Sequence, residues 1–236
     1  MMMALPANAD LPQSGSITAR WKLGESSGTR VDSVGSNDLS DSNTVTGTSS
    51  PQFGADASVF EENNSEYLSI ADNAALSGSG DMSFFCWTNS KGEPGAGYNT
   101  FMSKSSNADR GYEFRVGDYG KVELVASTDG STFDIYSSVT VSMVEHVWYH
   151  IGFVYDASAG EVKTYINGAQ FGATTTAQGT SIYDNAVAFQ IGAMLDQSRY
   201  MDGWIQDAIM WNGTELTAAE VEDLYNAYFN LPDEGD

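Results

Sequence analysis

Short runs of alternating apolar and polar residues, separated by turn signals, recur along this sequence. Dipeptides that favour tight turns stand at Asp129-Gly130, Asn167-Gly168 and Asn212-Gly213, and a longer Gly-containing loop spans 156–160. Asn-Gly and Asp-Gly supply the positive φ angles of hairpin turns, whose twist matches that of the flanking strands. The pattern predicts an all-β protein in which antiparallel hairpins are the main building unit.

Three runs rich in aromatic and β-branched residues are strong strand candidates: 147–155, 186–192 and 203–211. In 203–211, two sets of side chains alternate, because successive residues of a strand point to opposite faces of the sheet. We expect one face of this strand to meet a core and the other to be partly open.

One helix is well specified near the C-terminus. Thr217 and Glu220 have the spacing of a capping box, and Leu216 and Val221 have that of a hydrophobic staple. The apolar positions that follow recur at helical spacing and form one stripe. The sequence therefore predicts a single helix that begins after Thr217 and ends before Pro232.

The rest of the chain reads as one domain, residues 15–231, with an N-terminal arm at 1–14 and an acidic tail at 232–236. The arm has neither the basic segment nor the sustained apolar segment of a signal peptide. Its apolar residues suggest an arm that docks on a lattice of other proteins. Nowhere does an apolar run approach the roughly 18 residues of a membrane span, so we expect no membrane insertion.

Charge excludes further classes of function. The 236 residues include 10 Lys+Arg against 32 Asp+Glu, which gives a formal net charge of −22. Nucleic acid is therefore excluded as a partner, because phosphate contacts need clustered Lys and Arg.

Cys86 is the single cysteine, so no intrachain disulfide can form. Its apolar surroundings predict a small core residue.

A set of landmarks follows in an order typical of a known family. The ordered set resembles a laminin-G-like domain of the concanavalin A-like lectin/glucanase superfamily, over about residues 16–229. The resemblance implies a two-sheet antiparallel jelly-roll sandwich with one short C-terminal helix. The landmarks are Ala19-Arg-Trp-Lys-Leu23, Glu25-Ser-Ser-Gly28, Asp32, Ala57-Ser-Val-Phe60, Tyr67-Leu-Ser-Ile70, Asp81-Met-Ser-Phe-Phe-Cys-Trp87, Trp148-Tyr-His150, Tyr155-Asp156, Tyr165-Ile-Asn-Gly168, Gln190-Ile-Gly192, Asp202-Gly-Trp-Ile-Gln-Asp207, and the helix from Leu216 to Tyr225.

Members of such a family are often glycan- or protein-binding modules, many bind a structural Ca²⁺, and similar domains occur in phage tail and capsid-surface proteins. Some relatives are glycoside hydrolases, which need two carboxylates on one strand face. The Glu-x-Asp-x-x-Glu and Glu-x-Asp-x-Glu runs of retaining relatives are absent here. His150 matches a common structural histidine of the fold. We therefore expect a protein that is not an enzyme.

Two aspartates are candidate calcium ligands. Asp207 falls in the middle of a strand beside apolar residues, where a carboxylate must be paired, hydrogen-bonded or metal-bound. In related jelly rolls an aspartate at the matching place often ligates Ca²⁺, and Asp32 matches an aspartate that recurs early in the family. Hydrogen bonding of Asp207 without an ion is the open alternative.

Five tyrosines in expected loops are candidates for stacking on sugars: Tyr98, Tyr112, Tyr119, Tyr183 and Tyr200. The alternative for each is that its ring covers the end of a loop.

These observations favour a non-catalytic recognition or structural module on a virion surface, specifically a phage capsid decoration or tail component that binds host glycans. Its expected partners are other virion proteins or surface glycans, and a homo-oligomer is left open. A cellular carbohydrate-binding lectin or adhesion module, extracellular or on a cell surface, is the alternative. A glycoside hydrolase is the third and least favoured hypothesis.

Overall fold

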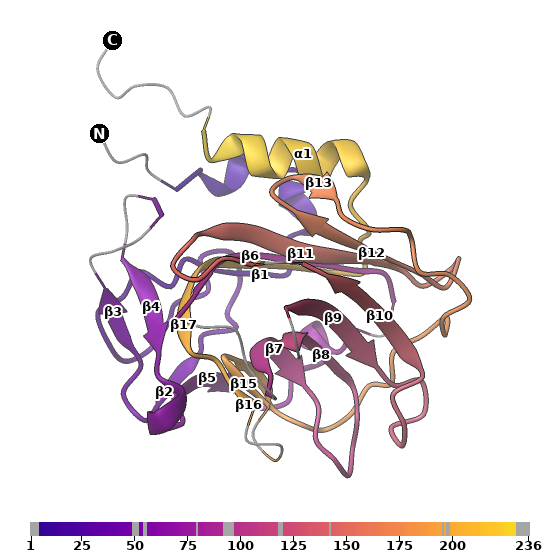
Figure 1. The fold of residues 1–236 in the computed structure, drawn as a ribbon, viewed down its shortest axis with the longest axis horizontal. Coiled ribbons are helices and arrows are strands. Elements are labelled where there is room, and N and C mark those ends of the chain that lie inside the picture. Colours follow the sequence, from indigo (N-terminus) through magenta and orange to yellow (C-terminus); the bar gives the residue numbers. More distant parts are fainter. Residues whose placement is uncertain are drawn as a thin grey trace.

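The computed structural model describes residues 5–48, 52–53, 56–78, 80–91, 97–117, 120–141, 143–194, 196 and 199–229. Two antiparallel sheets lie face to face as a sandwich, and helix α1 (Ala218–Ala227) crosses the outside of one sheet (Figure 1). The predicted all-β jelly-roll sandwich with one C-terminal helix is confirmed. None of the helices in the described ranges has the length and apolar character needed to cross a bilayer.

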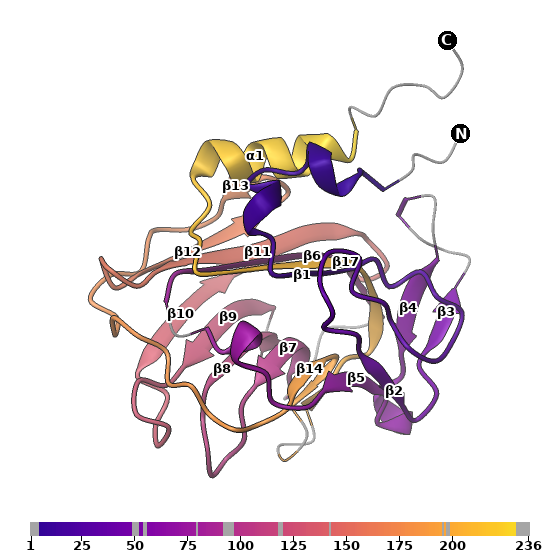
Figure 2. The same ribbon diagram turned by 180° about the vertical axis from the view of Figure 1, so that it is seen from behind.

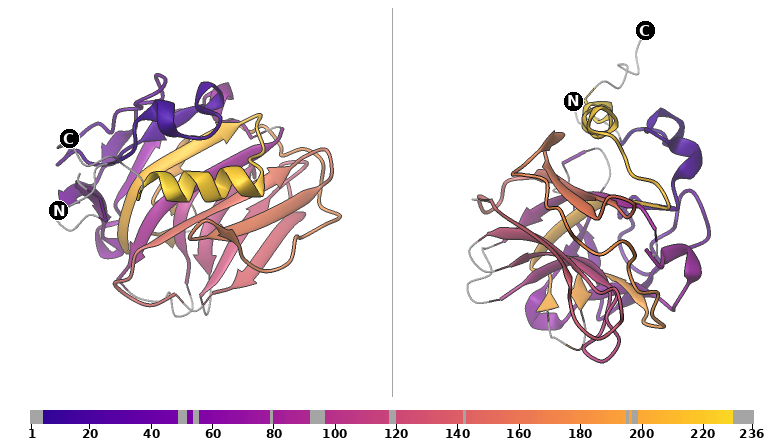
Figure 3. Two further views of the ribbon diagram at one scale, coloured as in Figure 1. Left: turned by 90° about the horizontal axis from the view of Figure 1, so that it is seen from above. Right: turned by 90° about the vertical axis from the view of Figure 1, so that its right-hand side faces the viewer.

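The sheet beneath α1 has eight strands in the order β13-β12-β11-β6-β17-β4-β3, with β1 paired to β17. In Figure 3, α1 runs across these strands when seen from above. The strands are β1 (Ala19–Trp21), β3 (Thr46–Thr48), β4 (Ala57–Phe60), β6 (Met82–Ser90), β11 (Tyr149–Asp156), β12 (Glu161–Ile166), β13 (Ala169–Gln170) and β17 (Gly203–Asn212).

The second sheet has seven strands in the order β10-β9-β8-β7-β14-β5-β2, and a separate two-stranded hairpin pairs β15 (Ala193–Met194) with β16 (Arg199–Tyr200). The seven strands are β2 (Ser40–Ser42), β5 (Tyr67–Ile70), β7 (Asn99–Lys104), β8 (Tyr112–Gly117), β9 (Lys121–Ala126), β10 (Ile135–Thr140) and β14 (Phe189–Ile191). Short 3-10 turns lie at Asn8–Asp10, Ser14–Ser16, Glu62–Asn64 and Ala74–Leu76.

The local predictions can be compared with these elements. Strands 147–155 and 203–211 are confirmed as β11 and β17, whereas 186–192 contains the shorter β14. The Asn167-Gly168 turn is confirmed: it joins β12 to β13, with φ angles of 50° and 80°. Asp129-Gly130 lies inside a longer loop between β9 and β10, and Asn212-Gly213 leads from β17 towards α1. The prediction of tight hairpin turns at these two places is therefore wrong.

Helix α1 begins as predicted. The Thr217 side chain accepts a hydrogen bond from the Glu220 backbone N–H, and the Glu220 side chain accepts one from the Thr217 N–H, which completes the capping box. Val221 and Leu224 point from the helix into the buried layer beneath it. The sequence thus specifies both where the helix starts and which face it buries.

Two apolar layers hold these elements together. The larger fills the space between the sheets and contains Cys86, whose thiol pKa is raised by burial, as expected of an inert core residue. The smaller lies between the outer face of the eight-stranded sheet and α1, and includes Trp87, Tyr165 and Trp211.

The N-terminal arm belongs to this smaller layer. Leu11 of the arm is 4% exposed there, Ile17 just after the arm is 7% exposed, and the indigo turns of this segment lie beside α1 in Figure 2. The expectation that apolar residues of the arm dock on a lattice is therefore wrong for Leu11, because its side chain is already buried within the chain. Ala4, another apolar residue of the arm, lies outside the described residues.

Candidate functional site

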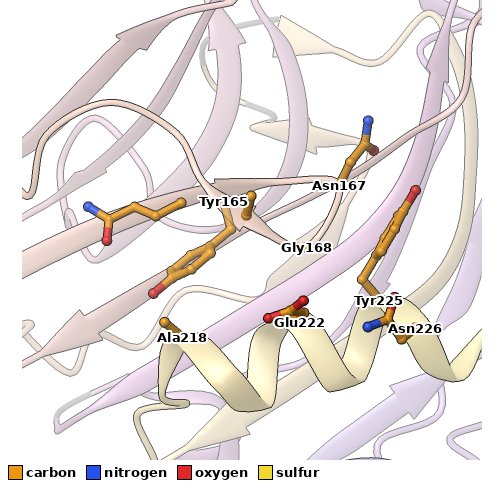
Figure 4. A pocket seen from close by; sticks show the side chains of 9 residues that line it. Tyr165, Asn167, Gly168, Ala218, Glu222, Tyr225 and Asn226 are labelled. Carbon is orange, nitrogen blue, oxygen red and sulfur yellow. The ribbon is translucent and has the colours of Figure 1, made fainter.

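A groove of about 350 Å³ lies between α1 and the turn that joins β12 to β13 (Figure 4). The hairpin contributes one wall and the helix the other, from segments about fifty residues apart in sequence. The lining residues are Tyr165, Asn167, Gly168, Ala169 and Gln170 from the hairpin, with Ala218, Glu222, Tyr225 and Asn226 from the helix.

The close approach of the two walls depends on Gly168. A Cβ atom at this position would lie 2.7 Å from the Cβ of Tyr225, closer than real Cβ atoms come to other atoms. The positive φ of Gly168 also favours glycine. The same dipeptide therefore turns the hairpin and allows it to contact α1.

Several polar groups of the groove lack partners within the protein. The carboxylate of Glu222 is exposed and makes no hydrogen bond or ion pair in the described part of the chain, and Figure 4 shows it projecting from α1 towards the hairpin. Asn167 Oδ1 accepts a hydrogen bond from the His150 backbone N–H at 3.0 Å, which leaves its amide NH₂ group available. Asn226 adds a second amide on the helix side. A carboxylate from one wall and amide groups from both walls thus line the same groove.

An aromatic ring completes the groove. Tyr225 is half-buried and stacks on Trp87 with ring centroids 5.7 Å apart, so one of its faces is supported from behind. Convergent polar groups beside a fixed aromatic ring are the usual composition of a small-ligand site. The arrangement can accept hydrogen bonds from hydroxyl groups, donate others, and pack against an apolar ring face.

His150 lies behind this ring in the buried layer. It is 1% exposed, stacks against Phe85 at 5.4 Å, and neither of its imidazole nitrogens has a hydrogen-bond partner among the described residues. Burial lowers the pKa of His150 to about 3, because the charged imidazolium would lose its hydration there. His150 is therefore neutral at ordinary pH and fills space, as expected of a structural histidine.

The two predicted calcium ligands do not form a calcium site. Arg20 Nε donates to Asp207 Oδ1 at 2.7 Å, Arg20 Nη2 donates to Oδ2 at 2.6 Å, and the Tyr228 hydroxyl donates to Oδ2 at 2.8 Å. Asp207 is 0% exposed, so both oxygens are occupied by protein donors beside a buried cation. A calcium ion does not fit there, and the alternative of a carboxylate paired without an ion is the one observed.

Asp32 also serves a structural purpose. Its carboxylate accepts backbone N–H groups from Arg20, Val34 and Asn37, each at 3.0 Å. Burial alone would raise its pKa, but these backbone hydrogen bonds outweigh burial and lower the pKa of Asp32. Asp32 and Asp207 thus both contact Arg20, in a network that holds the first strand in place.

A different group of carboxylates is arranged more suitably for a cation. One carboxylate oxygen from each of Asp81, Asp156 and Glu215 lies within 4.8 Å of the others, and all three side chains are half-buried. Burial and the nearby charge of Asp156 raise the pKa of Glu215, whereas the Ala159 backbone N–H lowers that of Asp156. These residues could offer oxygen ligands of the kind that Ca²⁺ prefers.

The four candidate tyrosines that the structure describes lie in different surroundings. Tyr112 lies within β8, is 0% exposed and donates a hydrogen bond to the Leu76 carbonyl, so its expected loop position is wrong. Tyr98 lies under the guanidinium groups of Arg115 and Arg199. Tyr200 is half-buried in β16, Tyr183 is 40% exposed, and Tyr119 lies outside the described residues.

The groove residues were missed in the sequence. The Asn167-Gly168 turn and the polar positions Glu222 and Asn226 of the helix were visible separately, but no local signal brings a hairpin and a helix together. Their contact depends on the whole eight-stranded sheet, which positions its edge strand β13 next to α1.

Comparison with known proteins identifies the class. A family model described as the concanavalin A-like lectin/glucanases superfamily matches residues 62–222. The chain therefore belongs to the concanavalin A-like lectin/glucanases superfamily. No curated protein matches the chain.

Solved structures show the same fold at low sequence identity. The binding domain of Paraclostridial mosquitocidal protein 1 has a TM-score of 0.71 and 14% identity, with 92% of this chain and 53% of that chain covered. A structure of botulinum neurotoxin type C, whose cell entry is described as dependent upon interaction with two ganglioside molecules, has a TM-score of 0.69 and 14% identity. That match covers 94% of this chain and 53% of the toxin chain. The binding domain of botulinum neurotoxin DC, in complex with rat synaptotagmin II, has a TM-score of 0.69 and 12% identity. That match covers 91% of this chain and 52% of the toxin domain. The chain spans about half the length of each.

Proposed function

We propose that this protein is a non-catalytic module that binds neutral glycans in the groove between α1 and the β12–β13 turn. The observation that carries the proposal is the Glu222 carboxylate, which has no partner among the described residues and lines the groove with the supported ring of Tyr225. Sugar hydroxyls donate to carboxylates and accept from amides, and sugar C–H faces pack on aromatic rings. The binding of gangliosides by a structural neighbour supports recognition of surface glycans.

Charge favours a neutral ligand in this groove. Glu222 has no cationic partner in the described part of the chain, so its negative charge is not compensated within the groove. An anionic sugar placed beside Glu222 would be repelled, whereas the hydroxyl groups of a neutral sugar would supply the missing donors.

The arrangement of two other glutamates supports a non-catalytic module over a glycoside hydrolase. Glu113 and Glu123 lie on the adjacent strands β8 and β9, and a glycoside hydrolase needs a pair of carboxylates as its acid and its nucleophile or base. Arg115 donates to Glu113 at 2.6 Å and to Glu123 at 3.0 Å, and Arg199 donates to Glu113 at 2.7 Å. Both carboxylates are thereby committed to buried ion pairs.

Removal of the Glu222 charge is expected to weaken glycan binding about tenfold, since one hydrogen bond to a charged group contributes roughly 1.5–3 kcal/mol. A glycan array of the full chain would first select a neutral ligand, and calorimetric titration would then compare the wild type with Glu222→Gln. Asp223→Asn is the matched control, because Asp223 is exposed on the same helix and does not line the groove. Equal affinity of Glu222→Gln and wild type would argue against this groove.

Binding of a structural Ca²⁺ stays a prediction, and its proposed ligands are now Asp81, Asp156 and Glu215. Added Ca²⁺ is expected to raise the melting temperature relative to chelator, because an ion that binds the folded state stabilises it. Glu215→Gln should remove that rise, with Glu161→Gln as a control. A melting temperature that is the same in Ca²⁺ and in chelator would count against the ion.

The setting we propose is the outside of a phage particle, with a cellular surface lectin or adhesion module as the alternative. Neighbouring structures described as binding domains support a role at a surface. Copurification of the chain with intact particles, and its loss from particle-free fractions, is the expected result. Recovery exclusively as particle-free protein would contradict the virion setting, and the size of that species would show whether a homo-oligomer forms.

A further inference from the structure

Arg110 differs from the other arginines of this acidic chain. Arg20, Arg30, Arg115 and Arg199 each have a carboxylate oxygen within 4.0 Å of a guanidinium nitrogen. Arg110 has none among the residues that the structure describes. In a chain with 32 acidic residues, an arginine without an acidic partner is available to a ligand that carries its own negative charge.

The guanidinium of Arg110 is held in a fixed place. Its central carbon lies 5.0 Å from the ring centroid of Phe133, and its Nη1 atom donates to the Ser131 carbonyl. The backbone N–H of Arg110 donates to the Gly130 carbonyl at 2.9 Å. Its Nε atom is buried without a partner, and no hydrogen bond of Nη2 is found in the described ranges. Within the described part of the chain, Nη2 is therefore the donor that is held in place and left for a ligand, whereas Nε is buried.

An exposed aromatic ring from the segment between β13 and β14 packs against this loop. Tyr183 is 40% exposed, its backbone N–H donates to the Ser127 carbonyl at 2.7 Å, and its ring covers Gly130. A Cβ atom at Gly130 would lie 2.8 Å from that ring, and the φ of Gly130 is 82°. Arg110 and Tyr183 are thus fixed against one turn of the β9–β10 loop.

Acidic residues near this loop are occupied by backbone groups. Asp129 Oδ1 accepts the Ser131 and Thr132 N–H groups at 2.7 and 3.3 Å, and Asp109 Oδ2 accepts the Ala186 N–H at 3.3 Å. These hydrogen bonds hold both carboxylates to the backbone, and within the described residues neither forms an ion pair with Arg110.

We propose that Arg110, Phe133 and Tyr183 form a second binding site, for the carboxylate of an acidic sugar such as a uronic acid. A planar guanidinium matches a carboxylate in geometry, and the aromatic rings offer apolar faces to the sugar ring. The site surrounds the β9–β10 loop of the seven-stranded sheet, with Phe133 from that loop, Arg110 from the β7–β8 connection and Tyr183 from the segment before β14. It goes beyond the neutral-glycan groove on the outside of the other sheet.

The test uses the full chain and two probes, methyl β-glucuronide and methyl β-glucoside, in NMR titrations. The wild type is expected to bind the glucuronide, with affinity that falls as salt rises, because screening weakens exposed charge pairs. Arg110→Gln is expected to lose at least about tenfold in affinity, which corresponds to one charge-assisted hydrogen bond. Lys121→Gln, at another cation without an ion pair among the described residues, is the matched control and should bind as the wild type does.

Two further variants keep the outcomes separate. Tyr183→Ala should also weaken glucuronide binding, and it replaces Arg110→Gln if that variant does not keep the wild-type melting temperature. Glu222→Gln should leave glucuronide binding unchanged, so failure of the groove and failure of this site are distinguishable. Absence of glucuronide binding by the wild type, or equal binding by wild type and Arg110→Gln, would overturn the proposal.

Discussion

Replacement of Asp207 with asparagine is expected to lower the free energy of unfolding by about 3–5 kcal/mol, the range for breaking a buried ion pair from one side. Arg20 would keep its charge at 0% exposure but lose its counterion. Asparagine is the suitable variant because Asp207 lies at a β-bulge with a φ of 49°, which asparagine tolerates. Urea unfolding of both proteins measures the difference.

The effect should extend to the groove. Arg20 also donates to the Pro6 carbonyl and to Asn8 Oδ1, and Asp207 accepts from Tyr228 at the end of α1. The pair therefore ties the N-terminal arm, β17 and α1 together, and its loss should loosen one wall of the groove. Asp223→Asn, an exposed control, should change stability by less than about 0.5 kcal/mol. If Asp207→Asn lowers the free energy of unfolding by less than about 1 kcal/mol, the conclusion that this ion pair holds the arm, β17 and α1 together would be contradicted.

Replacement of His150 with phenylalanine is expected to remove a large part of the loss of stability in acid. The unfolded chain binds a proton at His150 below about pH 6.5, but the folded protein does so below about pH 3. Between these values the unfolded state binds more protons, so stability falls as pH falls, by roughly 1.4 kcal/mol per pH unit. At pH 5 the free energy of unfolding of the wild type should therefore have fallen by about 2 kcal/mol through His150, and His150→Phe should not show this fall.

Phenylalanine suits this position because neither imidazole nitrogen has a hydrogen-bond partner to lose in the part of the chain that the structure describes, and the surroundings are aromatic. Urea unfolding of both proteins at pH 8 and pH 5 gives the comparison. His146→Asn is the control, since His146 is exposed and asparagine tolerates its positive φ. A stability difference between His150→Phe and wild type that is the same at both pH values would contradict a neutral buried His150.

Local signals in the sequence were sufficient for the elements that depend on a few adjacent residues. Thr217 and Glu220 predicted the start of α1, and Asn167-Gly168 predicted a two-residue turn, because caps and turns are determined by neighbouring backbone groups. Asp129-Gly130 carries the same signal, yet the loop around it is longer, since Tyr183 and Arg110 pack against it.

Features that depend on distant partners could not be predicted in this way. Asp207 was recognised as a carboxylate in need of a partner, but Arg20 lies 187 residues away in sequence and gives no periodic signal. Tyr112 lies in a strand instead of the predicted loop, and its neighbours Glu113 and Arg115 pair with each other instead of facing solvent. Glu222 became a candidate through the groove, which exists only in the folded chain.

The most direct test of the account is an NMR titration of the isotope-labelled full chain with a neutral oligosaccharide chosen from a glycan array. We expect saturable shifts of backbone signals at Glu222, Tyr225 and Asn226 of α1 and at Asn167 and Gly168 of the facing turn, and much weaker shifts in Glu222→Gln. Saturable shifts confined to other parts of the surface, or no shifts with any neutral glycan, would contradict the account.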